Sequence, residues 1–234
     1  MQNVSNKKIF FMLWLLCILG ALSVFPYVLS VNHLPDERSL GAVIFVSVLQ
    51  AALFFGLICW ASFKILPKTD LRPFLIENPR QQIVYPAVIS GILVWLVLFL
   101  ADKFLFDSSI SGMHPPLWAG AVASIYGAVN EEVLLRLFLF TLLYFLFMKM
   151  FRKSPTKRLA ILWSVNVLVA LIFGIGHLPL AFKLGASSAS EISRIVFLNG
   201  IAGVVFGWLY WSRGIWTAMA AHFIADLMVH VFFV

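Results

Sequence analysis

The sequence predicts an all-α protein: a polytopic transmembrane helical bundle of about seven spans, with a range of six to eight. Of its 234 residues, 62% are hydrophobic and only 12% are charged, and the mean hydropathy is +0.98. Such a composition is typical of membrane proteins and excludes an ordinary soluble domain. Seven apolar runs each approach the ~20 residues that a helix needs to cross a bilayer. They cover residues 9–31, 40–66, 83–106, 117–148, 159–178, 192–211 and 214–234.

The first run follows Lys7 and Lys8, as the apolar region of a signal peptide would. It is longer than such a region, and no convincing small-residue cleavage site follows it. We therefore expect a retained helix or an uncleaved signal anchor. The connector at 67–82 contains three prolines and is expected to be short, irregular and cytoplasmic.

Positive residues are divided unequally between the two sides that seven alternating spans would create. The side of the N-terminus holds twelve: Lys7, Lys8, Lys64, Lys68, Arg72, Arg80, Lys149, Arg152, Lys153, Lys157, Arg158 and Arg213. The opposite side holds four: Arg38, Lys103, Lys183 and Arg194. The positive-inside rule then predicts a cytoplasmic N-terminus. Membrane topology accounts for the net charge of +7, so we expect the lipid bilayer, and no nucleic acid, as a partner.

The fourth run contains the most unusual stretch of the chain, because Glu131, Glu132 and Arg136 interrupt a segment that is otherwise almost entirely apolar. Charges at membrane depth are costly and indicate a functional site by default. Glu132 and Arg136 are four residues apart on a helix and can pair, whereas Glu131 is turned by about 100° and keeps a free carboxylate. The alternative is a structural ion pair between helices. Because the run is longer than one span needs, we expect Gly127 to break it, which would put Glu131 near the start of the spanning helix.

Two more polar features lie in later spans. His177 ends the fifth run and follows two glycines, and its alternative role is that of a packing residue at the membrane edge. His222 and Asp226 are four residues apart in the last run and share a face, either as a site or as a polar pair that joins helices. In the sixth run, Gly203 and Gly207 form a small-xxx-small pattern that favours close helix packing.

Together these features predict one shared cavity. A glutamate with two histidines is the minimum set for activating water, with or without a metal. The chain has no His-Glu-x-x-His, no Gly-x-Ser-x-Gly and no pair of transmembrane aspartates. The depths are difficult to reconcile, because His177 ends an in-to-out span while His222 lies about 12 Å from the inner end of the last one. They converge only if helices are tilted or broken, or if the orientation or one boundary is wrong.

Three motifs in this order resemble a known family: Glu-Glu-x-x-x-Arg at 131–136, Phe-x-x-x-His at 173–177 and His-x-x-x-Asp at 222–226. The pattern is similar to the CPBP family, which includes type II CAAX prenyl endopeptidases and the bacterial Abi and bacteriocin-processing proteins. The similarity covers about residues 117–230. It implies that residues 117–234 form a CPBP-like catalytic core, and that residues 1–116 form N-terminal transmembrane helices with a cytoplasmic connector.

The resemblance implies an intramembrane endopeptidase in which Glu131 is the general base that activates water, helped by His177. His222 and Asp226 would stabilise the oxyanion or complete the polar cluster, and Glu132 and Arg136 would support the base helix. Members often have Asn in place of Asp226. An ionised Asp226 is a poor oxyanion donor, so it would have to be protonated or act through His222. Glu131, His177 and His222 are the candidate ligands for Zn²⁺, and a metal-free mechanism stays open.

The implied substrate is a membrane-associated or lipid-modified peptide or protein, and the implied location is a bacterial inner membrane. Two other classes remain as alternatives. One is a non-proteolytic immunity or partner-binding scaffold on the same fold. The other is a transporter that uses Glu131, His177 and Asp226 as a proton relay, although the sequence lacks the inverted repeats of many transporters.

Overall fold

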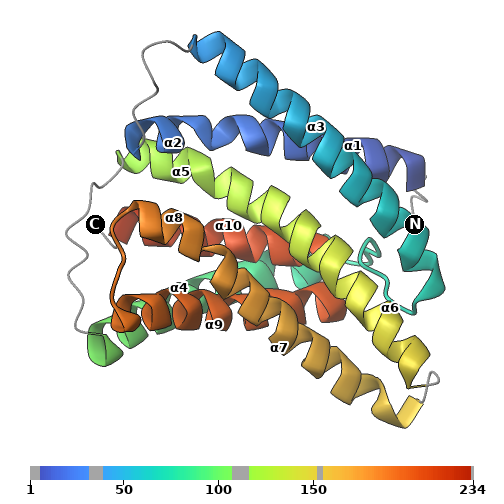
Figure 1. The fold of residues 1–234 in the computed structure, drawn as a ribbon. Coiled ribbons are helices and arrows are strands. Elements are labelled where there is room, and N and C mark those ends of the chain that lie inside the picture. The colour runs from blue at the N-terminus through green and yellow to red at the C-terminus, as the bar shows by residue number, and fades with distance from the viewer. Residues whose placement is uncertain (1–5, 32–38, 107–115, 152–154, 233–234) are drawn as a thin grey trace.

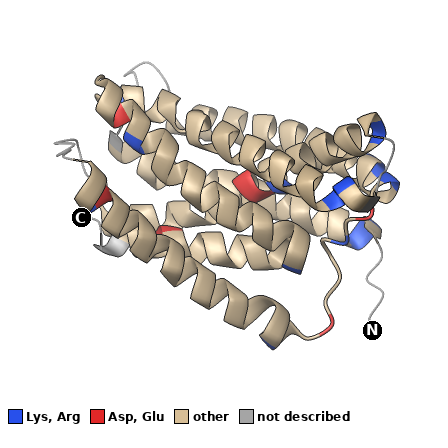
Figure 2. Cartoon of the chain, turned by 90° about the horizontal axis from the view of Figure 1, so that it is seen from below, with Lys and Arg blue, Asp and Glu red and all other residues tan. Residues whose placement is uncertain are grey.

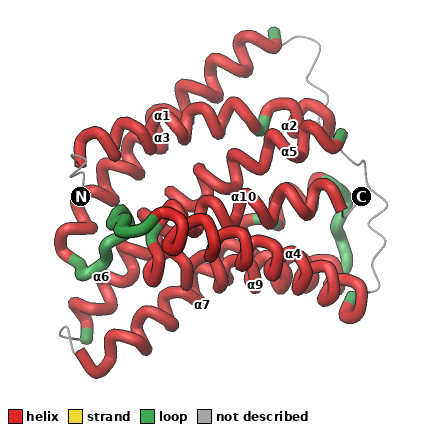
Figure 3. Tube along the Cα trace, turned by 180° about the vertical axis from the view of Figure 1, so that it is seen from behind, coloured by secondary structure: helices red, strands yellow, loops and turns green. Residues whose placement is uncertain are grey.

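The computed structural model describes residues 6–31, 39–106, 116–151 and 155–232. Every regular element among these residues is a helix (Figures 1 and 3). Six helical stretches are long and apolar enough to cross a membrane, and a shorter apolar stretch covers Ile215–His230 of the last helix. The chain is therefore a polytopic helical bundle of about seven spans, as the hydropathy predicts. The helices are α1 Asn6–Ser23, α2 Phe25–Val31, α3 Leu40–Ile65, α4 Tyr85–Leu105, α5 Leu117–Tyr126, α6 Thr141–Met150, α7 Arg158–Gly176, α8 Leu178–Lys183, α9 Ala189–Arg213 and α10 Ile215–Phe232.

The fourth span is one unbroken helical stretch from Leu117 to Met150. The expected break at Gly127 is wrong: the α-helical turns of α5 continue there as wider π-helical turns, over Gly127–Glu131 and Val133–Phe140, before α6. Glu131 consequently lies near the middle of the stretch and not at its start. Wide π-turns inside helices occur often at functional sites, so their position around Glu131 favours a functional role for this part of the stretch.

The α5–α6 stretch runs between two groups of helices (Figure 1). α1 and α3 pack together on one side, and α10 packs against α4, α5 and α9 on the other. α7 packs along α9, where Gly203 allows close approach because a Cβ there would lie 3.0 Å from Ala170. Gly91 likewise lets α4 approach α10, since a Cβ would lie 2.8 Å from Ile224. The small-xxx-small pattern in α9 thus has the packing role that was predicted.

Two buried asparagines join helices in the same way. Asn130 Nδ2 donates to the Cys17 carbonyl of α1 at 2.8 Å, and Asn166 Nδ2 donates from α7 to the Val204 carbonyl of α9 at 2.9 Å. In each case a glycine three residues after that carbonyl, Gly20 or Gly207, faces the amide oxygen so closely that a Cβ would collide with it. A hydrogen bond between helices is worth up to about 1–2 kcal/mol in a membrane, so these contacts hold α1 and α9 in register.

Lysines and arginines gather at the end of the bundle where the N-terminus lies (Figure 2). The connector packs back onto the bundle at this end. The Pro73 carbonyl accepts a hydrogen bond from Ile215 N at 3.0 Å, and Gly214 adopts a φ of +103° that lets the α9–α10 turn approach it. Gln82 Nε2 donates to the Arg213 carbonyl at 3.0 Å. The connector therefore positions the start of α10, the helix that carries His222.

Candidate active site

A cavity of about 410 Å³ lies inside the bundle, and all four residues that the resemblance makes catalytic line it: Glu131, His177, His222 and Asp226. Its walls come from α2, α4, the α5–α6 stretch and α7 to α10. The prediction of one shared cavity is confirmed. The predicted boundary of the fifth span was wrong: this span extends from Arg158 to Lys183, so His177 does not end it. Glu131 lies near the middle of the fourth span, and the depths of the site residues therefore converge.

Glu132 and Arg136 form the predicted ion pair across one helical turn, with 2.9 Å between Oε1 and Nη1. Both side chains are fully buried. Arg136 Nη2 also donates to the Gly203 carbonyl of α9 at 3.2 Å. A buried charge needs a partner at close range, so each member of this pair requires the other. The pair also ties the α5–α6 stretch to α9.

His222 connects this ion pair to the cavity. Its Nδ1 lies 2.8 Å from Glu132 Oε1, and because the paired carboxylate can only accept, Nδ1 carries a hydrogen and donates it. Its Nε2 then lies 3.4 Å from Asp226 Oδ2 and 3.8 Å from Glu131 Oε2. A bare Nε2 lone pair facing a carboxylate is unfavourable, so a proton belongs in this contact. It sits either on Nε2, making an imidazolium, or on Asp226.

The three carboxylates differ sharply in their access to the cavity. The side chain of Glu131 is 25% exposed and that of Asp226 is 31% exposed, whereas that of Glu132 is fully buried. The contact between Glu131 and His222 is too long for a direct hydrogen bond. Glu131 is therefore the carboxylate that can meet a water molecule or a substrate, and Glu132 is committed to His222 and Arg136.

His177 lies at the end of α7, on the cavity wall. Its Nδ1 is 2.8 Å from the Phe173 carbonyl, which can only accept, so Nδ1 donates and Nε2 is the ring nitrogen left for a further partner. Among the described residues, no hydrogen bond joins His177 to Glu131, His222 or Asp226. Glu131, His222 and Asp226 therefore lie in direct contact, whereas His177 only lines the same cavity.

Two phenylalanines enclose the polar groups. The Arg136 guanidinium lies 4.9 Å from the centre of the Phe173 ring and 5.7 Å from that of Phe206. His222 stacks on Phe206 with 4.5 Å between ring centres, and Phe173 meets both histidines edge to face. Aromatic faces attract cations, so this enclosure favours positive charge on Arg136 and His222. Phe173 appears in the sequence motif without a predicted role, and no sequence signal singles out Phe206.

Gly127 has a role that the sequence did not indicate. A Cβ at this position would lie 2.5 Å from Asp226 Oδ2 and 3.2 Å from His222 Nε2. The absence of a side chain therefore allows α10 to bring its polar face against the helix that carries Glu131. Its position four residues before Glu131 was the sequence signal available for this role, but Gly127 was interpreted as a helix break.

One residue that lines the cavity belongs to an ion pair that was not expected as part of a site. Arg194 of α9 lines the cavity and donates from Nη2 to Asp102 Oδ2 of α4 at 2.7 Å. The two side chains are 17% and 18% exposed. They join α9 to α4 beside the cavity and neutralise each other there.

The side chains do not fit the proposed zinc site. Over the described ranges, no three His, Cys, Asp or Glu side chains are grouped so that they could hold one metal ion. His222 is engaged by Glu132 at Nδ1 and faces Asp226 at Nε2, so it does not converge with His177 and Glu131 as ligands around one centre would.

Comparison with known proteins gives one match. Residues 113–228 match the family model described as type II CAAX prenyl endopeptidase, Rce1-like, and this segment contains all three motifs of the site. No curated protein and no solved structure matches the chain. The matched segment contains Glu131, His177, His222 and Asp226, while α2 and α4, which also line the cavity, lie outside it. The chain thus belongs, through residues 113–228, to the Rce1-like type II CAAX prenyl endopeptidase family, a family of intramembrane proteases.

Proposed function

We propose that this protein hydrolyses a peptide bond in a membrane-associated or lipid-modified peptide or protein, using a water molecule activated by Glu131. The observation that carries the proposal is the unequal state of two adjacent carboxylates. Glu132 is buried and bound to Arg136 and His222. Glu131 faces the cavity, and among the described residues its ion-pair contact is the 3.8 Å approach to His222, which is too long for a hydrogen bond. A general base must be free to accept a proton from water, and Glu131 meets that requirement.

In the proposed reaction, Glu131 takes a proton from water as the water oxygen adds to the carbonyl carbon of the scissile bond. The carbonyl oxygen becomes an oxyanion and accepts a hydrogen bond from His222 Nε2–H. When the carbon–nitrogen bond breaks, Glu131 returns the proton to the amine that leaves. The products are a carboxyl terminus and an amine, and the side chains end in their starting states.

The surroundings support these roles. Glu132 at Nδ1 holds the His222 ring so that Nε2 faces the cavity, which is how a carboxylate prepares a histidine to donate. A preorganised donor of this kind is commonly worth about 10²–10³ in rate. Nε2 of His177 can accept a hydrogen bond from the second hydrogen of the water, and this bond would orient the water oxygen. Asp226 acts through His222, as an ionised carboxylate could not itself donate to an oxyanion.

An apolar cavity beside the candidate active site supports a substrate with a lipid or other long apolar part. A second, mostly apolar cavity of about 390 Å³ lies between the ends of α1 and α3. It shares Val24, Val28 and Tyr126 with the cavity that holds Glu131. An apolar chain could occupy it while the attached peptide reaches Glu131.

From the charge asymmetry we further propose that the N-terminus is cytoplasmic.

The experiment is cleavage of a quenched fluorogenic peptide by the full-length protein in liposomes. The peptide ends in Cys-a-a-X and is tested with and without a farnesyl group on the cysteine. We expect Glu131→Gln to abolish cleavage while thermal unfolding in detergent stays as in the wild type. Glu77→Gln, which changes an exposed glutamate in the connector, is the matched control and should cleave normally.

Two results would contradict the proposal. Full cleavage by Glu131→Gln would remove the glutamate mechanism. A wild-type protein that cleaves neither peptide, but retains a membrane partner equally with and without the Glu131→Gln change, would instead favour a non-proteolytic scaffold.

A further inference from the structure

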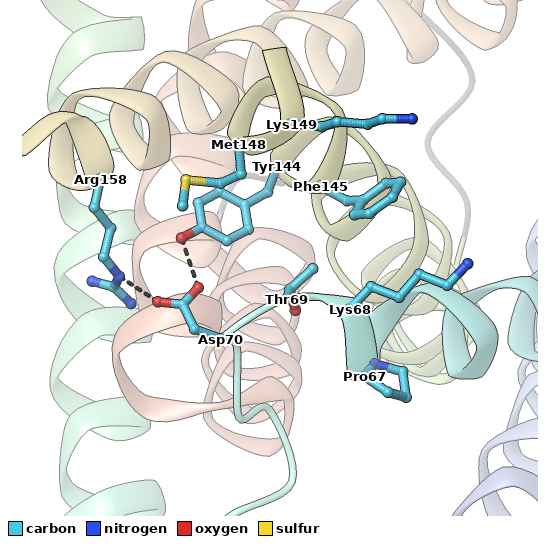
Figure 4. A pocket seen from close by; sticks show the side chains of 9 residues that line it. All are labelled: Pro67, Lys68, Thr69, Asp70, Tyr144, Phe145, Met148, Lys149 and Arg158. Carbon is cyan, nitrogen blue, oxygen red and sulfur yellow. Dashed lines mark hydrogen bonds and ion pairs between the residues drawn. The ribbon is translucent and has the colours of Figure 1, made fainter. Parts of the chain in front are cut away.

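A third cavity lies at the basic end of the bundle and shares no lining residue with the cavity that holds Glu131. It has a volume of about 690 Å³, large enough for a lipid headgroup, and is bounded by the turn after α3, by α6 and by the start of α7. Figure 4 shows the side chains that line it: Pro67, Lys68, Thr69, Asp70, Tyr144, Phe145, Met148, Lys149 and Arg158. None of them belongs to the candidate active site described above.

An internal clamp builds one wall of this cavity. Asp70 accepts a hydrogen bond from Tyr144 Oη at 2.7 Å and another from Arg158 Nε at 2.6 Å (Figure 4). The turn itself is held by Thr69, whose Oγ1 donates to the Leu66 carbonyl at 2.8 Å and accepts from Leu71 N at 3.3 Å. These bonds join the turn to both α6 and α7, so the cavity is formed before any ligand arrives.

Asp70 is paired with Arg158, so its negative charge does not neutralise the two lysines that line the cavity, Lys68 and Lys149. Lys68 and Lys149 extend in the same direction on either side of Phe145 in Figure 4, and Lys68 Nζ lies 5.8 Å from the centre of that ring. Among the described residues, neither lysine has a carboxylate partner. Both lysines line the cavity, so an anion inside it would be attracted to two positive charges.

The position of the cavity indicates where its anion comes from. Lys68 is the last residue of one candidate span, Arg158 is the first of another, and Lys149 lies next to the end of a third at Met150. Residues at the ends of spans lie at the level of the lipid headgroups. Phe145 and Met148 add apolar walls beside the two charges. A phosphate at headgroup depth with an apolar chain attached is a phospholipid.

We propose that this cavity binds the headgroup of an anionic phospholipid, with Lys68 and Lys149 holding its phosphate. Basic pockets between transmembrane helices are suited to such headgroups. Each basic side chain near an anionic surface contributes about 1 kcal/mol, which is about fivefold in affinity, so the two lysines together supply about 25-fold. The site is independent of the peptidase mechanism and stands whichever substrate the enzyme has.

The test is native mass spectrometry of the full-length protein titrated with phosphatidylglycerol or with phosphatidylcholine of the same acyl chains. We expect the wild type to prefer phosphatidylglycerol, and Lys68→Gln/Lys149→Gln to weaken its binding by about 25-fold. Lys68→Arg/Lys149→Arg keeps both charges and should retain the preference. Lys7→Gln/Lys8→Gln is the matched control: it removes two charges from exposed positions at the N-terminus of α1, outside the cavity, and should bind phosphatidylglycerol as the wild type does.

Three outcomes would overturn the proposal. Equal binding of the two lipids by the wild type would show that charge is not recognised. An equal loss in the Lys7 and Lys8 control would show a general charge effect and no site. Displacement of phosphatidylglycerol by millimolar inorganic phosphate would show a site for soluble phosphate in place of a lipid.

Discussion

Glu132 and His222, ninety positions apart in the chain, meet at 2.8 Å inside the bundle. The same carboxylate oxygen of Glu132 is paired with Arg136 at 2.9 Å, so one buried carboxylate serves both a cation on its own helix and a histidine on another. This arrangement converts a local ion pair into the support of the candidate active site. Its energetic and its chemical contributions can be separated by mutation.

Glu132→Gln should lower the free energy of unfolding by about 3–5 kcal/mol, because it leaves Arg136 buried without a charged partner. Cleavage should fall at the same time. In Glu132→Gln/Arg136→Met both charges are gone, so stability should return to nearly that of the wild type. Cleavage should nevertheless stay about 10–100-fold low, since His222 has still lost its carboxylate. Thermal unfolding in detergent and peptide cleavage measure the two quantities. Recovery of both in the double variant would show that Glu132 has only a structural role.

Asp226→Asn should keep cleavage within about tenfold of the wild type, because an amide can still exchange a hydrogen bond with His222 Nε2. Asp226→Leu, of similar size, leaves Nε2 without that partner and should reduce kcat by about 10²–10³. Initial rates in liposomes provide the comparison. If both substitutions cost the same, the proposed action of Asp226 through His222 is wrong.

Gly127→Ala should abolish most cleavage, because its Cβ would lie 2.5 Å from Asp226 Oδ2 and would force α10 away from Glu131. Gly200→Ala is the control, since a Cβ there meets nothing within 4 Å. Within a helix this control change is expected to be neutral or to stabilise by up to about 1 kcal/mol. Rates and thermal unfolding should be measured for both. A fully active Gly127→Ala would show that the close approach of the two helices is not needed for chemistry.

The clamp at Asp70 should make stability depend on acid pH. Burial alone raises the pKa of the Asp70 carboxyl, but hydrogen bonds from Tyr144 and Arg158 outweigh it and hold this pKa below its ordinary value. A lowered folded-state pKa stabilises the protein above the unfolded value of about 3.9, and this contribution is lost as the pH falls through the folded-state pKa. Because Asp70 and Arg158 are nearly half exposed, we expect Asp70→Asn to cost only about 0.5–1 kcal/mol at neutral pH.

The cost of Asp70→Asn should disappear in acid, where the wild-type carboxyl is itself protonated. Unfolding of wild type and variant is compared at neutral and at acid pH, with Glu77→Gln as the control in the same connector. A cost that is the same at both pH values would mean that the charge of Asp70 does not stabilise the turn.

The sequence by itself determined the features that depend on composition and on short spacing. Apolar runs of membrane length predicted the spans, because the bilayer imposes that length on any helix that crosses it. The four-residue spacing of Glu132 and Arg136 predicted their pair, and the offset of Glu131 predicted its free carboxylate, because both follow from helical geometry alone. The order of the motifs predicted the family that residues 113–228 match.

Only the tertiary structure decided which residues meet across helices. The contact of Glu132 with His222, the enclosure of Arg136 by Phe206 and the need for Gly127 all depend on how α10 and α9 pack against the α5–α6 stretch. The unbroken helix through Gly127 was missed because a glycine is compatible both with a break and with close helix contact. Hydropathy specifies that helices span the membrane, but their rotation and neighbours are set by side-chain packing between distant segments, which no local pattern contains.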